Sequence, residues 1–227
     1  MSNSTHDGHR KRLRAKFLSA PETLEDHELL ELLLFYSIPR ANTNEIAHRL
    51  LSRFGSIKGI VNAGLPALKE VDGIGENAAL FLRAVSEYTA RYERSKVELS
   101  APLTSHEELG AYLRSLFVGY DNEVAFLLLF DSSMRLLLCE KVSEGYSAGN
   151  VLSTRTIASI ALASNAPTAI LVHNHPGGKP IPSGDDIAIT GHLRWFLNSL
   201  QIQLVDHFIV AGDECRAILE PQKFKDM

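Results

Sequence analysis

The stretch TAILVHNHPGGKPIPSGDD, residues 168–186, decides how the second half of this chain is expected to fold. Its apolar beginning, residues 168–173, is typical of a buried β-strand. Alternate side chains of a strand point to the same face, so His173 and His175 are expected to share one face at the C-terminal end of the strand. Two imidazoles and a returning carboxylate from Asp186 make three of the four ligands of a tetrahedral zinc and leave one position for water. The stretch therefore predicts a catalytic rather than a structural metal site.

Ser183 and Asp186 allow two interpretations. Ser-x-x-Asp in front of an amphipathic helix is a capping box, and the helix dipole stabilises an acidic residue in the first turn. The loop over residues 176–182 is also long enough to bring the start of that helix back to the metal. The two interpretations are compatible, because a first-turn position would hold Asp186 firmly. Next to the two histidines, the functional interpretation is favoured.

Length and composition indicate a globular protein with room for one full domain and a small one. The 227 residues are 45% hydrophobic and 22% charged, which is ordinary for globular chains. The net charge of −4 gives no general electrostatic reason to expect nucleic acid, although it does not exclude a local basic patch. The two cysteines, Cys139 and Cys215, rule out a disulfide scaffold and suit a reducing compartment. With no secretory signal and no run long enough to span a membrane, we expect a soluble cytoplasmic protein.

Hydrophobic periodicity divides the chain into a helical part and a mixed part. Residues 1–95 show apolar residues at helical spacing, which predicts a small all-α domain. Residues 96–103 have the composition of a linker. In residues 104–227 strands alternate with helices, which predicts an α/β domain with helices packed on a mixed sheet.

The individual elements are expected from the same patterns. In the first domain, helices are expected over residues 24–35, 44–54, 65–71 and 77–94. In the second domain, helices are expected over residues 105–117, 154–165 and 185–200, and strands over residues 124–130, 135–142, 168–173, 203–211 and 216–219.

The spacing His-x-His, seven residues, then Ser-x-x-Asp resembles the motif of the JAMM metalloproteases, also called MPN+ or JAB. His173, His175, Ser183 and Asp186 fit that motif without adjustment. The chain more closely resembles the bacterial RadC-like family, whose signature begins His-Asn-His-Pro-Ser-Gly, and Gly177 stands in place of that serine. The resemblance implies a JAMM/MPN-like, cytidine-deaminase-like α/β fold.

Carried over residue by residue, the resemblance implies a zinc-dependent metallopeptidase or isopeptidase acting on a protein or peptide. His173, His175 and Asp186 would be the Zn²⁺ ligands. Ser183 would hydrogen-bond the developing oxyanion or the metal-bound water. The motif also requires an upstream glutamate as general acid/base just before the first strand, and Glu123 best fits that place.

Other residues near the motif remain open. Glu140 and Glu144 are the rivals of Glu123 for the role of base. Asp206 and His207 on a later strand either orient a metal ligand or make structural hydrogen bonds. A nucleobase deaminase is excluded, because it needs His-x-Glu and a later Pro-Cys-x-x-Cys, and His175 occupies the glutamate position.

Residues 65–85 contain a segment that resembles one helix-hairpin-helix, and residues 28–35 also resemble the N-terminal region of the RadC-like family. Gly73 and Gly75 would let the hairpin approach a phosphate, whose oxygens would meet backbone N–H groups. DNA affinity depends on basic residues, however, and this hairpin has Lys69 among three acidic ones. The alternative is a turn that packs against its neighbour or a protein partner.

The second functional hypothesis is therefore a DNA-binding accessory or repair protein that uses the JAMM-like domain for contacts. The basic run at residues 10–16 would be a further phosphate contact, or equally a solvated and frayed tail. The sequence leaves the oligomeric state open.

Overall fold

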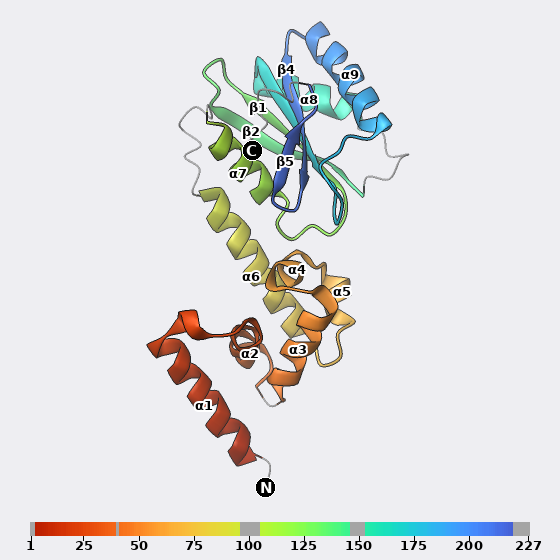
Figure 1. The fold of residues 1–227 in the computed structure, drawn as a ribbon. Coiled ribbons are helices and arrows are strands. Elements are labelled where there is room, and N and C mark those ends of the chain that lie inside the picture. The colour runs from red at the N-terminus through yellow and green to blue at the C-terminus, as the bar shows by residue number, and fades with distance from the viewer. Residues whose placement is uncertain (1–2, 40, 96–104, 146–152, 220–227) are drawn as a thin grey trace. The chain divides into compact units, whose positions relative to one another are not determined.

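The computed structural model divides the chain into two compact units, residues 1–88 and residues 89–227 (Figure 1). The structure describes residues 3–39, 41–95, 105–145 and 153–219. The linker expected over residues 96–103 lies outside these ranges. No helix in the described ranges is long and apolar enough to cross a membrane.

The first unit is built from helices. They are α1 (Asn3–Ser19), the short 3-10 helix η1 (Pro21–Thr23), α2 (Asp26–Ser37), α3 (Thr43–Phe54), α4 (Ile57–Asn62), α5 (Leu65–Lys69) and the first part of α6 (Glu76–Ser95). Apolar side chains at helical spacing on α2, α3 and α6, among them Leu34, Leu50 and Leu82, form a common core. The expected helical nature of this region is confirmed, and α1 and α4 are additional helices.

Helix α1 differs from the frayed tail that the sequence allowed. Leu13 is only 3% exposed and packs with Phe35 of α2. The Arg10 guanidinium lies over the Phe35 ring and donates hydrogen bonds to the carbonyl oxygens of Ile38, the C-cap of α2, and of Ala41, in the connection to α3. Part of the basic run therefore anchors one helix on another, because Arg10 supplies a donor to the Ile38 carbonyl at the end of α2, where carbonyl groups lack a partner within the helix.

A mixed five-stranded sheet forms the second unit and confirms the expected fold class (Figure 1). Its strands are β1 (Val124–Phe130), β2 (Leu136–Glu144), β3 (Thr168–Asn174), β4 (Gln203–Ala211) and β5 (Glu214–Ala217), in the order β2-β1-β3-β4-β5. Strands β3 and β4 are parallel, and the other neighbouring pairs are antiparallel. Strand β5 begins two residues before the expected range of 216–219.

Helices cover both faces of this sheet. Helix α7 (His106–Leu116) packs on one face, in a core that includes Val172 and Phe208. Helices α8 (Thr154–Ser164) and α9 (Gly184–Ser199) pack on the other face, in a core that includes Leu127 and Leu171. Strand β3 is therefore buried from both sides, which explains why its sequence is a continuous apolar run. Its C-terminal end carries the two histidines of the predicted metal site.

Candidate metal centre

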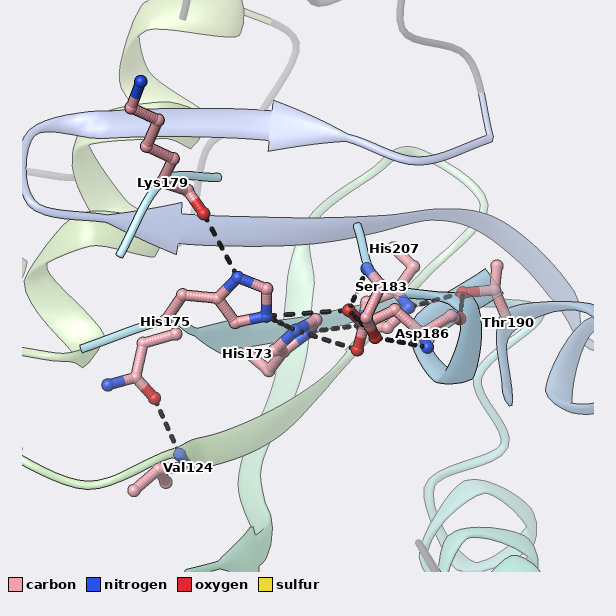
Figure 2. A network of polar contacts seen from close by, with 9 residues as sticks. Val124, His173, His175, Lys179, Ser183, Asp186, Thr190 and His207 are labelled. Atoms are coloured by element: carbon pink, nitrogen blue, oxygen red, sulfur yellow. Dashed lines mark hydrogen bonds and ion pairs between the residues drawn. The ribbon is translucent and has the colours of Figure 1, made fainter. Parts of the chain in front are cut away.

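His173 and His175 lie at the C-terminal end of β3 and close together, as their spacing predicts (Figure 2). Their Nε2 atoms are 2.9 Å apart. His173 is 3% exposed, whereas the side chain of His175 is 18% exposed. The N–H of His175 donates to the carbonyl oxygen of Val210 at 2.8 Å, which continues the pairing with β4 beyond the last residue of β3. The site is therefore attached to the centre of the sheet and open towards His175.

The loop after β3 turns back by means of one left-handed residue. Gly177 has a φ of +68°, a conformation that glycine adopts without steric cost. The N–H of Gly178 then donates to the carbonyl oxygen of His175 at 3.2 Å. The same turn places the carbonyl oxygen of Lys179 at 3.2 Å from Nδ1 of His175. A proton on Nδ1 donates to this carbonyl, so Nε2 is the atom of His175 that is free to bind a metal.

Ser183 and Asp186 form the capping box of α9 that the sequence predicts. The N–H of Asp186 donates to Ser183 Oγ at 3.1 Å, and the N–H of Ser183 donates to Asp186 Oδ2 at 2.7 Å. Ser183 Oγ also donates to Asp186 Oδ2 at 2.7 Å. The cap fixes the carboxylate of Asp186 on the side of the histidines, so the structural and functional interpretations hold together.

Three potential ligand atoms converge at this point. Asp186 Oδ1 lies 3.2 Å from Nε2 of His173, and Asp186 Oδ2 lies 3.6 Å from Nε2 of His175. One ligand atom from each of the three residues lies within 4.8 Å of the other two, so the cluster could hold a metal ion. Asp186 is 2% exposed and, within the described ranges, forms no ion pair with a lysine or arginine. A buried carboxylate in that situation suits a metal ligand, because buried charges are normally paired or bound to a metal.

The hydrogen bonds around Asp186 keep it ionised. Burial alone would raise the pKa of this carboxyl group, but hydrogen bonds from His173 and from the hydroxyl and backbone N–H of Ser183 outweigh it. The net result is a pKa below the ordinary value of an aspartate. A metal would therefore meet a carboxylate that is already charged and oriented.

Asn174, between the two histidines, ties the first strand to the site. Its Oδ1 accepts a hydrogen bond from the N–H of Val124 at 2.7 Å, and its Nδ2 donates to the carbonyl oxygen of Asn122 at 3.0 Å. The chain on either side of Glu123 is thus held by a residue of the metal motif. This role of Asn174 was missed from the sequence, where a polar residue at the end of an apolar strand is the available signal.

Glu123 immediately precedes β1, where the sequence places it. Ala125 pairs with His173 in the antiparallel ladder, and paired residues point to the same face of a sheet. Glu123 is two residues before Ala125, so continuing the alternation puts it on the face of the two histidines. The N–H of Gly145 also donates to the carbonyl oxygen of Glu123 at 2.8 Å. The catalytic role of Glu123 stays a prediction.

The two rival glutamates lie in β2. Glu144 pairs with Val124, which contributes to the core on the opposite face from His173. Its carboxylate accepts a hydrogen bond from Lys141 at 2.5 Å, which lowers the pKa of Glu144. Glu140 pairs with Leu127, whereas His173 pairs with Ala125, so Glu140 lies two residues along β1 from the level of His173. Both positions are less favourable than that of Glu123.

Asp206 and His207, which the sequence leaves open together, have separate roles. Asp206 Oδ1 accepts hydrogen bonds from the backbone N–H groups of His207, Ile218 and Leu219. These bonds have a structural role, because those from Ile218 and Leu219 fasten the residues after β5 to β4. The ring of His207 instead contacts His173, and Nε2 of His207 lies 2.7 Å from Nδ1 of His173. Burial lowers the pKa of His207 well below its ordinary value, so this imidazole is neutral.

The helix-hairpin-helix-like segment lies between α5 and α6. Gly73 has a φ of +94°, and a Cβ there would lie 2.8 Å from the side chain of Ile46, so any other residue would be strained and would displace Ile46. At Gly75 no described atom lies within 4 Å of such a Cβ. The basic side chains around the hairpin are held by acidic ones, in the pairs Lys69–Glu76, Arg53–Glu70 and Arg49–Asp72. These pairings reduce the positive charge available to a phosphate.

Comparison with known proteins agrees with the geometry of the site. Residues 103–223 match the model of the RadC-like JAB domain, and the chain belongs to this family. It is also similar to the UPF0758 protein SPO0054 of Ruegeria pomeroyi, with 34% identity over 203 residues, which are 89% of this chain and 91% of that protein. The resemblance to the RadC-like family is therefore confirmed.

Proposed function

We propose that this protein is a zinc-dependent metallopeptidase or isopeptidase. The observation that carries the proposal is the convergence of His173, His175 and Asp186, with ligand atoms within 4.8 Å of one another. Two imidazole nitrogens and one carboxylate oxygen form a donor set that suits Zn²⁺ and leaves a fourth position open. The partial exposure of His175 supports access to this centre from solvent.

A bound Zn²⁺ would supply Lewis acidity, which polarises a carbonyl group and lowers the pKa of water towards about 7. Glu123 accepts the proton of the attacking water and returns it to the leaving amine. The products are a carboxylate and an amine, so the bond that breaks is an amide or isopeptide bond.

Ser183 has two tasks in this proposal. In the structure its hydroxyl group donates to Asp186 Oδ2 at 2.7 Å and so orients that carboxylate. During the reaction the hydroxyl rotates to donate to the oxyanion that develops on the substrate carbonyl. The backbone N–H of Ser183, which donates to the same Oδ2, keeps Asp186 in place meanwhile.

The test compares wild-type protein, Glu123→Gln and the control Glu140→Gln on a candidate-substrate library and a cell lysate. New N-termini and diglycine remnants are identified by mass spectrometry. We expect cleavage by wild type and Glu140→Gln, loss of cleavage in Glu123→Gln, and the same zinc content in all three proteins. Cleavage by Glu123→Gln at the wild-type rate would remove Glu123 as the base. No cleavage by zinc-loaded wild type would count against a peptidase.

A further inference from the structure

A chain of buried polar groups lies behind the candidate metal centre (Figure 2). Nδ1 of His173 is 2.7 Å from Nε2 of His207, and Nδ1 of His207 is 2.6 Å from Oγ1 of Thr190. Oγ1 of Thr190 is in turn 2.6 Å from the backbone carbonyl oxygen of Asp186. All four residues are buried. The chain therefore begins at one metal-binding residue and ends at another.

The hydrogen-bonding capacities of these groups give the chain one direction. The carbonyl oxygen of Asp186 can only accept, so the hydroxyl of Thr190 donates to it. That hydroxyl has a single hydrogen, and Thr190 Oγ1 must therefore accept from Nδ1 of His207. His207 is 2% exposed, and its ring nitrogens contact Thr190 and His173 rather than a carboxylate, so a single proton, on Nδ1, satisfies its surroundings. Nε2 of His207 is then an acceptor, and Nδ1 of His173 donates to it. Because Nδ1 of His173 is taken up by this bond, Nε2, which faces Asp186, is the ring nitrogen that is left for a metal ion.

We propose that Thr190 and His207 are positioning residues that set the tautomer and ring orientation of His173 for metal binding. The inference rests on the proposed function only in requiring a metal at this centre, and it needs neither a substrate nor turnover. It also explains why a histidine and a threonine are buried side by side between β4 and α9, where apolar residues would otherwise complete the core.

The two ligand histidines are thus held in different ways. Nδ1 of His175 donates to the backbone carbonyl of Lys179, which no side-chain substitution removes. Nδ1 of His173 donates to the side chain of His207, so its tautomer depends on residue 207 and, through it, on residue 190. The acceptor is a neutral imidazole rather than a carboxylate, so it adds no negative charge to the centre.

Thr190 offers a matched pair of variants. Thr190→Val has the same shape but cannot accept from His207, which would then protonate on Nε2 and oppose the Nδ1–H of His173. Thr190→Ser keeps the hydroxyl. Zinc affinity is measured by chelator competition on the full chain, together with the melting temperature of the zinc-free protein. We expect Thr190→Val to weaken zinc binding by about 10–100-fold, the usual effect of losing such a group, and Thr190→Ser to bind like wild type.

His207 offers a second pair. The amide oxygen of His207→Gln can accept from Nδ1 of His173, whereas His207→Leu cannot. We expect the leucine variant to lose zinc affinity and the glutamine variant to recover most of it. A purely structural role predicts instead that zinc affinity follows the melting temperature in all four variants, whichever group was removed.

The tautomers can also be observed directly. In zinc-loaded protein labelled with nitrogen-15 in histidine, long-range proton–nitrogen NMR spectra should show His207 protonated on Nδ1 and unprotonated on Nε2, with His207→Gln assigning its signals. A proton on Nε2 of His207, or equal zinc affinity in Thr190→Val and Thr190→Ser, would overturn the inference while leaving the peptidase proposal intact. Zinc binding without any cleavage would overturn the peptidase proposal and leave the inference about His207 and Thr190 intact. A wild-type protein that binds no zinc would overturn both.

Discussion

Nε2 of His173 lies 3.2 Å from Oδ1 of Asp186, although His173 lies near the end of β3 and Asp186 belongs to the first turn of α9, after a long loop. The capping bonds with Ser183 aim the carboxylate at the imidazole. The helix cap and the candidate metal site therefore depend on the same short segment, and substitutions in it are expected to affect both stability and metal content.

Removing a ligand should abolish metal binding. We expect wild-type protein to hold about one zinc per chain, and His173→Ala and Asp186→Asn to hold none. Asp186→Asn is the informative change, because its amide oxygen can still accept from the N–H of Ser183 and so preserve the cap. His192→Ala, which alters a histidine elsewhere on α9, is the control. Elemental analysis of the purified proteins measures the zinc content per chain. Zinc retained by both ligand variants would refute the site.

Ser183→Ala should destabilise the second unit. The N-cap hydroxyl accepts the N–H of Asp186, and losing such a cap costs about 0.5–2 kcal/mol in the free energy of unfolding. Ser183→Thr retains an oxygen that can cap the helix and should cost less. Urea unfolding of zinc-free protein measures both variants. Equal stability of Ser183→Ala and wild type would show that the capping box contributes nothing.

Glu28 should make the first unit sensitive to acid. Its carboxylate accepts a hydrogen bond from Lys16 of α1 at 2.5 Å, and this bond lowers the pKa of Glu28 below its ordinary value of 4.5. A lowered pKa means that the contribution to stability is present above pH 4.5 and disappears as the pH falls through the lowered value. Because the pair is partly exposed, with the Lys16 and Glu28 side chains 38% and 22% exposed, solvent weakens it, and we expect Glu28→Gln to cost about 0.5–1 kcal/mol at neutral pH.

Denaturant titrations at several pH values measure the difference in free energy of unfolding between wild type and Glu28→Gln. The stabilities of wild type and Glu28→Gln should converge in acid, because both side chains are then uncharged. Gln at position 28 also preserves part of the capping box at the start of α2, so the comparison isolates the charge. A difference that persists unchanged in acid would contradict the assignment to the Lys16 bond.

The hairpin glycines should separate folding from DNA binding. We expect Gly73→Ala to destabilise the first unit by about 1–3 kcal/mol, because of its positive φ and its contact with Ile46. Gly75→Asp should leave the fold intact, since no described atom lies near a Cβ at that position. Circular dichroism during thermal unfolding distinguishes the two variants.

With its lysine and arginines already paired, the hairpin is expected to bind duplex DNA weakly at low salt, with the same affinity in wild type and Gly75→Asp. Fluorescence anisotropy with labelled duplex tests this expectation. Tight binding that falls steeply with salt and is lost in Gly75→Asp would establish the DNA-binding hypothesis instead.

Much of the second unit could be predicted from local patterns. Apolar runs and alternation located the strands, and the Ser-x-x-Asp spacing identified Ser183 as the N-cap of α9. Such patterns are reliable because they depend on the periods of helix and strand over a few residues. Helix α1 was missed because its sequence is strongly polar, and its position depends on contacts of Leu13 and Arg10 with α2, which is distant in sequence.

The sequence by itself determined the candidate ligand set, because His173, His175 and Asp186 lie in one short segment whose geometry follows from a strand end and a helix cap. Only the tertiary structure decided which buried side chains contact His173 from the side away from the candidate metal site. Thr190 and His207 come from α9 and β4, 17 residues apart, and meet because β3 and β4 are parallel neighbours with α9 packed across them. No local period encodes that contact, since it depends on strand order and on the rotation of the helix.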